Sequence, residues 1–101
     1  MTRIVVSPQA GADIEGILDH LFEAAGISVV ERYAADFQAL DDRLTMFPAS
    51  GVLRPQLGKN TRVAVLDPYL VIYDHAVGGE TLTFLRVLDG RRNITRRMVR
   101  G

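Results

Sequence analysis

The sequence predicts an α+β domain in which a helical hairpin packs on a small, mainly antiparallel sheet, with the element order β-α-α-β-β-β and an optional final helix. Two amphipathic stripes at helical spacing occupy residues 8–47, and strand-like alternation occupies residues 61–88. Glycine and proline turns separate these runs. Because 101 residues support one hydrophobic core, we expect a single domain over residues 1–101.

The first two elements are a short strand and a long helix. Residues 3–6, Arg-Ile-Val-Val, predict a strand that must pair within the sheet. Ser7 is the expected N-cap, and Pro8 occupies the first helical position, where a missing N–H costs nothing. Gly26 is expected to end the helix in a left-handed conformation. The apolar stripe of this helix consists of Ala10, Ile14, Ile17, Leu18, Leu21, Phe22 and Ala25.

A second helix follows almost directly. Ser28 and Glu31 have the spacing of a capping box, which predicts a helix start at this point, and Pro48 ends the helix. The apolar positions step by three and four residues, a pattern typical of a helix that lies antiparallel against another helix. This stripe consists of Val30, Tyr33, Phe37, Leu40, Leu44 and Phe47.

The rest of the chain predicts a connecting loop and a meander of strands. Residues 48–60 form the loop, which ends in a turn at 58–60. Turns at Asp67-Pro68 and Gly78-Gly79 separate the strands that follow. A short final helix is predicted over Arg91–Val99, with Ile94 and Met98 four residues apart. The predicted strands are Thr61–Leu66, Tyr69–His75 and Thr81–Leu88.

The charges of this neutral chain are segregated. Residues 1–50 carry eight acids and three bases, whereas residues 86–101 carry six arginines and one acid, Asp89. A tail rich in arginine favours forked contacts to carboxylates or phosphates, and therefore an anion or an acidic partner. An alternative is that the tail neutralises the acidic helices.

Several classes of function are disfavoured by composition. The chain has no cysteine, and His20 and His75 lie far apart, so we expect no metal site and no cofactor. We expect His20 to be an exposed helix residue, and Tyr69 and Tyr73 to be packing residues of the sheet. No apolar run is long enough for a membrane span and no signal peptide is evident, so we expect a cytoplasmic protein.

Two motifs resemble the RelE/ParE toxins of bacterial toxin–antitoxin modules, particularly the ParE branch. One is the loop Pro48-x-x-Gly51-x-x-Arg54-Pro55, and the other is the segment 86–92, Arg-Val-Leu-Asp-Gly-Arg-Arg. A histidine often stands in the family where this chain has Asp89, which argues against acid–base chemistry there. Further matches are Ala12, Asp13, Ile14, Ile17, Leu18, Ala34, Phe37, Leu40, Phe47, Leu57, Arg62, 69–73, Asn93 and Ile94.

The resemblance implies a bacterial toxin that a cognate antitoxin neutralises in a hetero-oligomer. RelE-like members cleave mRNA on the ribosome, whereas ParE-like members poison DNA gyrase. RNA cleavage without a metal needs a base, an acid and a cation. No histidine follows His75 and no tyrosine follows Tyr73, so no catalytic residue is assigned. This inventory favours the ParE-like activity. The alternatives are a ribosome-dependent mRNA endoribonuclease and a non-toxic relic that only binds the antitoxin.

The candidate binding residues fall into two sets. Arg62 and Arg86 match family arginines on the sheet, although a structural pair with Asp74 or Glu80 is an equal alternative for either. An antitoxin with an acidic or amphipathic C-terminal segment is expected to contact the rim of the helix pair and part of the tail. The target-binding hypothesis comprises Arg62, Arg86, Arg91, Arg92, Arg96 and Arg97. The antitoxin-binding hypothesis comprises Ile14, Leu18, Tyr33, Phe37, Arg91 and Arg92.

Overall fold

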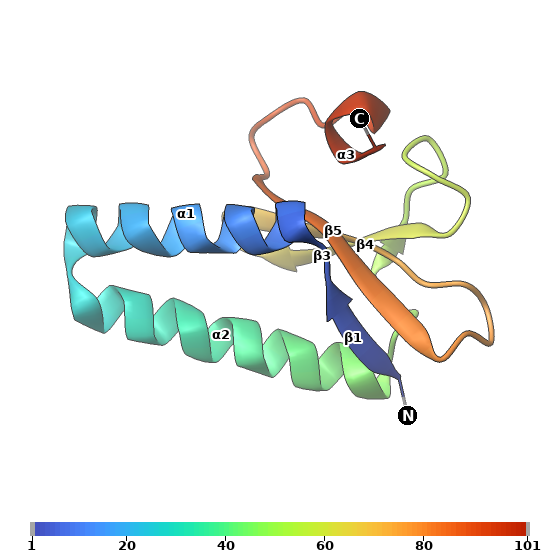
Figure 1. Cartoon of the computed structure of the whole chain (residues 1–101), viewed down its shortest axis with the longest axis horizontal. Coiled ribbons are helices and arrows are strands. Elements are labelled where there is room, and N and C mark those ends of the chain that lie inside the picture. The colour runs from blue at the N-terminus through green and yellow to red at the C-terminus, as the bar shows by residue number, and fades with distance from the viewer. Residues whose placement is uncertain (1, 101) are drawn as a thin grey trace.

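The computed structural model describes residues 2–100, which form a helical hairpin, a sheet and a short C-terminal helix (Figure 1). The predicted α+β class is confirmed, and the predicted element order holds apart from one added two-residue strand, β2. The observed elements are β1 (Arg3–Val6), α1 (Pro8–Ala25), α2 (Ile27–Met46), β2 (Val52–Leu53), β3 (Thr61–Leu66), β4 (Tyr69–Asp74), β5 (Thr81–Asp89) and α3 (Arg96–Arg100).

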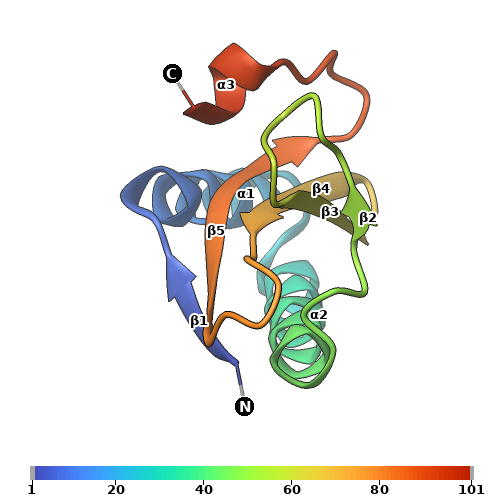
Figure 2. The ribbon, with the colours of Figure 1, turned by 90° about the vertical axis from the view of Figure 1, so that its right-hand side faces the viewer.

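The sheet has the order β1-β5-β4-β3-β2 and is mainly antiparallel (Figure 2). β1 pairs with β5 in parallel, from Arg3 opposite Thr81 to Val6 opposite Phe84. The first strand therefore pairs within the sheet as predicted, although it remains an edge strand. The last three strands match their predicted bounds to within one residue.

The two helices are joined by a single glycine. Ser7 caps α1 as predicted, because its Oγ accepts a hydrogen bond from the Ala10 N–H at 3.0 Å. Gly26 ends α1 with φ 86°, a value that favours glycine, but its ψ of −178° is extended. Gly26 is also the N-cap of α2, and no side chain caps that helix. The predicted capping box is thus wrong, since Ser28 already lies within the first turn of α2.

Two apolar clusters hold the sheet, one on each face. α1 and α2 cover one face, where Leu44, Tyr73 and Phe84 are among the buried residues. The other face packs against α3 and the loop after β2, with Ile72 and Val99 buried there. Tyr69 and Tyr73 are packing residues of the sheet, as predicted, and both pack on the helical side.

The ends of both predicted helical stripes are exposed. Phe22 is 55% exposed and Phe47 is 61% exposed. Phe22 lies toward the tip of the hairpin, which extends beyond the sheet (Figure 1). Phe47 follows the last residue of α2, so the chain has already left the helix. Burial is therefore limited to the part of each stripe that the sheet covers.

Two C-terminal and loop predictions need correction. The loop 48–60 contains the two-residue strand β2, which pairs with β3. The final helix spans Arg96–Arg100 only, not Arg91–Val99. The Arg92 N–H donates to the Asp89 carbonyl, which turns the chain after β5. Thr95 then accepts a bond from the Met98 N–H and begins α3.

The loop before β2 rests on Tyr73. The buried hydroxyl of Tyr73 donates to the Pro48 carbonyl at 2.7 Å and accepts from the Gly51 N–H at 2.9 Å. A Cβ at position 51 would lie 2.5 Å from that hydroxyl, so the contact requires glycine. Arg62 supports the same loop by donating to the Ala49 and Gly51 carbonyls. The loop is therefore held on the sheet by the side chains of Tyr73 and Arg62.

Replacing Tyr73 with phenylalanine is expected to lower the free energy of unfolding by about 1–3 kcal/mol, because the Gly51 N–H loses its buried partner. Tyr33→Phe is the control, since the Tyr33 hydroxyl forms no hydrogen bond within residues 2–100. Denaturant unfolding of both variants measures the difference. Equal stability of Tyr73→Phe and the wild type would contradict the role of this hydroxyl.

Candidate functional site

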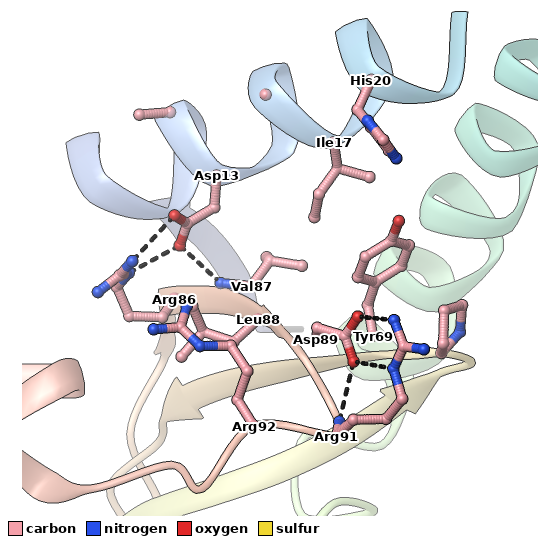
Figure 3. Close-up of a pocket in the computed structure, with 13 residues that line it drawn as sticks. Asp13, Ile17, His20, Tyr69, Arg86, Val87, Leu88, Asp89, Arg91 and Arg92 are labelled. Carbon is pink, nitrogen blue, oxygen red and sulfur yellow. Dashed lines mark hydrogen bonds and ion pairs between the residues drawn. The ribbon is translucent and has the colours of Figure 1, made fainter. Parts of the chain in front are cut away.

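A groove of about 460 Å³ runs between α1 and the carboxyl end of β5 (Figure 3). Its walls come from α1, from the turn before β4, and from β5 with the loop that follows it. Four of its side chains are cationic or can become so, and two are carboxylates. The lining residues are Ala12, Asp13, Gly16, Ile17, His20, Pro68, Tyr69, Arg86, Val87, Leu88, Asp89, Arg91 and Arg92.

The groove forms where β5 continues beyond its partner β1. β1 ends at Val6, and the start of α1 then takes over the open edge of β5. Ser7 Oγ donates to the Leu85 carbonyl at 3.1 Å, and Asp13 accepts from the Val87 N–H at 2.9 Å. These contacts satisfy backbone groups that the strand edge would otherwise leave unpaired. They also place the side of α1 next to the end of β5.

Asp13 and Arg86 form the central ion pair of the site. Arg86 Nε donates to Asp13 Oδ2 at 2.7 Å and Nη2 donates to Oδ1 at 3.1 Å, a forked geometry. Arg86 Nη1 also donates to the Met98 carbonyl at 2.6 Å. Hydrogen bonding to Asp13 raises the pKa of Arg86. Arg86 thus ties α1, β5 and α3 together, and its structural partner is Asp13 rather than Asp74 or Glu80.

Asp89 and Arg91 form a second pair at the mouth of the groove. Asp89 accepts hydrogen bonds from the Arg91 N–H at 2.9 Å, from Nε at 3.1 Å and from Nη2 at 2.8 Å. These bonds lower the pKa of Asp89 to about 2. Asp89 is therefore paired with an arginine, and at neutral pH it is a carboxylate that cannot donate a proton.

The C-terminal arginines differ in whether their side chains form hydrogen bonds and ion pairs within the protein. Arg100 donates to the Leu57 carbonyl at 2.7 Å and to Asp74 at 2.8 Å. Within residues 2–100, the side chains of Arg92, Arg96 and Arg97 form neither a hydrogen bond nor an ion pair. Among the described residues, the Arg86–Asp13 pair is the only ion pair between this tail and the acidic helices. The tail therefore does not neutralise these helices in general.

The predicted target-binding residues do not form one cluster. Arg62 lies on β3, two strands from β5, and is occupied with the loop carbonyls. Arg86 is occupied with Asp13, whereas Arg91 and Arg92 line the groove. Arg96 and Arg97 lie in the short helix α3. The exposed part of the predicted set is thus the chain that follows β5.

The predicted antitoxin-binding residues lie on two sides of α1. Ile14, Leu18 and Phe37 line a second groove, of about 200 Å³, between α1 and α2. Tyr33 does not line that groove. Its ring packs edge-on against Tyr69, with ring centroids 6.1 Å apart, and Tyr69 lines the first groove. At 100° per residue, positions 14 and 18 of α1 point away from positions 16 and 20.

Sequence reasoning missed three residues of the first groove. Asp13, His20 and Tyr69 were not assigned to a site, although His20 is exposed as predicted. Burial raises the pKa of Tyr69, so its hydroxyl stays protonated at neutral pH. The helical spacing of Asp13, Ile17 and His20 places them along one side of α1. Nothing in the sequence indicated that this side faces β5.

The described part of the chain offers neither a metal site nor a membrane-spanning helix. Residues 2–100 contain no group of three or more His, Cys, Asp or Glu side chains arranged to hold a metal ion. Over the same residues, no helix combines the length and the apolarity that a membrane crossing requires.

The architecture defines the class of protein first. A two-helix hairpin on a five-stranded mixed sheet, with an arginine-rich segment after the last strand, is the arrangement expected for the small α+β toxins of the RelE/ParE type. Comparison with known proteins then defines the family.

The model of the "ParE toxin of type II toxin-antitoxin system, parDE" family matches residues 4–94, so the chain belongs to this family. Toxin ParE3 of Caulobacter vibrioides (strain ATCC 19089 / CIP 103742 / CB 15) is 28% identical over 94 residues, which cover 93% of this chain and 92% of that protein. A solved structure described as "Chromosomal ParDE TA system from P. aeruginosa" has the same fold, with a TM-score of 0.71 and 21% identity. The match covers 88% of this chain and 96% of that one. The protein is a ParE-type toxin of a type II toxin–antitoxin system, and this family implies an antitoxin partner.

Asp13→Ala is expected to lower the free energy of unfolding by about 3 kcal/mol, because it leaves the half-buried Arg86 guanidinium without its carboxylate and the Val87 N–H without a partner. Asp19→Ala removes an exposed carboxylate of the same helix and should change stability by less than about 0.5 kcal/mol. Denaturant unfolding, together with hydrogen exchange at the Val87 amide, measures both effects. Equal losses in the two variants would show that the Asp13 pair does not hold α1 on β5.

The Asp89–Arg91 pair predicts a pH dependence at acid pH. The folded-state pKa of Asp89, about 2, lies below its ordinary value of 3.8. The stabilisation is therefore complete above about pH 4 and is lost as the pH falls through about 2. Carboxyl ¹³C NMR should show the Asp89 midpoint near the lower value, and Arg91→Ala should move it up toward 3.8. A midpoint unchanged by Arg91→Ala would contradict the pairing.

Proposed function

We propose that this toxin acts by binding DNA gyrase and poisoning it, without a catalytic step of its own. The observation that carries the proposal is the set of arginines on the segment after β5 whose side chains have no partner within residues 2–100, namely Arg92, Arg96 and Arg97. Guanidinium groups without internal partners are free to bind the carboxylates of a protein or the phosphates of its DNA. Membership of the ParE family supports gyrase as the target.

The arginine segment is held in place on the sheet, which favours a binding role. Arg86 binds the Met98 carbonyl from one side, and Arg100 binds the Leu57 carbonyl from the other. Val99 is buried in the second apolar cluster. Such anchoring reduces the entropy lost when the arginines between the end of β5 and these contacts engage a partner. The segment therefore presents its free charges in a defined arrangement.

The chemistry of the groove argues against efficient RNA cleavage. Arg86 is engaged by Asp13, so its charge is already compensated. Asp89 is ionised at neutral pH and cannot serve as an acid. The raised pKa of Tyr69 disfavours its use as a base.

A second candidate function has one observation in its favour. His20, Tyr69 and Arg92 line the same groove, so an imidazole, a phenol hydroxyl and a guanidinium without a partner in the described chain lie around one cavity. Ribosome-dependent mRNA cleavage would use such groups as base, acid and phosphate ligand. If this activity is the true one, His20→Ala should abolish mRNA cleavage in a translating extract while the folded protein remains stable.

We also propose that a cognate antitoxin neutralises the toxin in a hetero-oligomer within the cytoplasm. The apolar groove of Ile14, Leu18 and Phe37 and the charges of Arg91 and Arg92 offer the two kinds of contact that an amphipathic acidic segment needs. Because the two sets flank α1, a segment that used both would cross this helix. Arg91 and Arg92 would then serve both the antitoxin and the target.

Replacing Arg91 and Arg92 with alanine is expected to abolish inhibition of gyrase while leaving the fold intact, because both side chains are exposed. Supercoiling and DNA cleavage by purified gyrase measure the effect, with and without the antitoxin. Arg32→Ala/Arg43→Ala is the matched control, since it removes two exposed arginines of α2. Full inhibition by the Arg91/Arg92 variant would remove these residues from the target interface. No effect of the wild-type toxin, even in large excess, would contradict gyrase as the target.

A further inference from the structure

A cavity of about 310 Å³ lies on the sheet face opposite the helical hairpin, and we call it the arginine pocket. It lies between the loop after β2 and the segment after β5, which run close together there (Figure 2). Its floor is apolar, because Leu57 and Val63 are buried and Leu70 and Ile94 are half-buried. Of the described residues, Arg92 alone lines both this pocket and the groove beside α1. The arginine pocket is therefore a separate feature of the surface.

The polar side chains of this pocket are two guanidinium groups and two amides. Arg54 and Gln56 come from the loop after β2, and Arg92 and Asn93 come from the segment after β5. Within residues 2–100, these four side chains form no hydrogen bond and no ion pair, and no acidic residue lines the pocket. The groove beside α1 differs, since two carboxylates there are bound to arginines. The uncompensated charge of the pocket therefore calls for an anion.

Both arginines of the pocket extend from backbone that the fold holds in place. The Arg54 N–H donates to the Thr61 carbonyl at 2.8 Å, and the Arg54 carbonyl accepts from the Leu57 N–H at 3.0 Å. The Arg92 N–H donates to the Asp89 carbonyl at 3.1 Å. Cations whose backbone is already ordered lose less entropy when they bind a ligand. The two walls of the pocket thus present their donors without a prior rearrangement of the loops.

The arrangement of the donors favours a phosphate over a carboxylate. A carboxylate is planar, and one guanidinium fork satisfies its two oxygens, whereas a phosphate is tetrahedral and accepts from several directions. The pocket brings a guanidinium and an amide from each of two walls. Arginine, asparagine and glutamine side chains are common donors to the phosphates of nucleic acids. The apolar floor adds a surface on which a sugar or a base can lie.

We propose that the arginine pocket binds a phosphate group of a nucleotide unit, with Arg54 and Arg92 as its two guanidinium ligands. Gln56 and Asn93 donate further hydrogen bonds, and the sugar of the unit covers the apolar floor. The proposal goes beyond gyrase binding, because it assigns Arg54 to a site and holds whichever protein is the target. The phosphate belongs either to a nucleic-acid strand or to a free nucleotide, since both carry the chemistry that this pocket recognises.

Titration of the toxin alone with nucleic acid tests the pocket without gyrase. The probe is a fluorescent DNA duplex or its single strand, and anisotropy is measured over a range of salt concentrations. Arg54→Ala should weaken binding roughly tenfold and should lower the slope of log affinity against log salt by about 1, because one charge-assisted phosphate contact is lost. Arg54→Lys should restore the slope, since it keeps the charge. Arg32→Ala is the matched control, because Arg32 is an exposed arginine of α2 that lines none of these cavities.

A second measurement identifies the source of the phosphate. In ¹⁵N NMR, the Nε–H groups of Arg54 and Arg92 and the side-chain amides of Gln56 and Asn93 should shift when a phosphate ligand binds. Shifts with adenosine monophosphate indicate a free nucleotide, and shifts with the oligonucleotides alone indicate a strand; either result supports the site. Shifts with polyglutamate but with no phosphate probe would overturn the proposal in favour of an acidic protein partner.

The outcome for Arg54→Ala is decisive because the exposed Arg54 side chain supports no other part of the described chain. Circular dichroism should therefore show that this variant is folded. Unchanged DNA affinity and an unchanged salt slope in folded Arg54→Ala would overturn the phosphate site, as would the absence of binding of every phosphate probe to the wild-type toxin. Neither result would bear on gyrase, whose inhibition is measured separately.

Discussion

The ion pair between Asp13 and Arg86, which lie 73 residues apart in the sequence, joins three parts of the fold. Asp13 belongs to α1, Arg86 belongs to β5, and the Arg86 guanidinium also holds the Met98 carbonyl of α3. The same carboxylate accepts from the Val87 N–H, so it replaces the missing partner strand at the edge of β5. A forked, half-buried pair has a fixed geometry, and both of its residues line the groove beside α1. The groove therefore depends on one carboxylate.

Some arginines of the C-terminal segment stabilise the fold, whereas others remain available to bind a partner. Arg86 and Arg100 anchor the C-terminal segment, while Arg92, Arg96 and Arg97 remain without partners in the described chain. A segment that is fixed at both ends and charged in between suits a protein whose task is to bind. In the proposed account, Arg92 serves the target in the free toxin and the antitoxin in the neutralised complex. Neutralisation then needs no change in the fold of the toxin.

Local patterns predicted most of the elements, whereas long-range contacts could not be predicted. Ser7-Pro8 and the apolar stripes placed α1 and α2 because capping and helical spacing act within a few residues. The capping box at Ser28 was wrong because Gly26 turns the chain within one residue. The Asp13–Arg86 pair spans 73 residues and depends on the parallel pairing of β1 with β5, which no local pattern encodes. For the same reason His20 and Tyr69 were not assigned to a common groove.

The most direct test of the account is to identify what the segment after β5 touches in the cell. A photo-crosslinking amino acid at Asn93, an exposed residue beside Arg92, keeps every arginine in place, and the same group at Ala35 reports non-specific contacts. The account predicts crosslinks from position 93 to a gyrase subunit in cells that make the toxin alone, and to the antitoxin when both are made. Crosslinks to ribosomal components instead of gyrase would contradict the central claim that this toxin acts by binding gyrase.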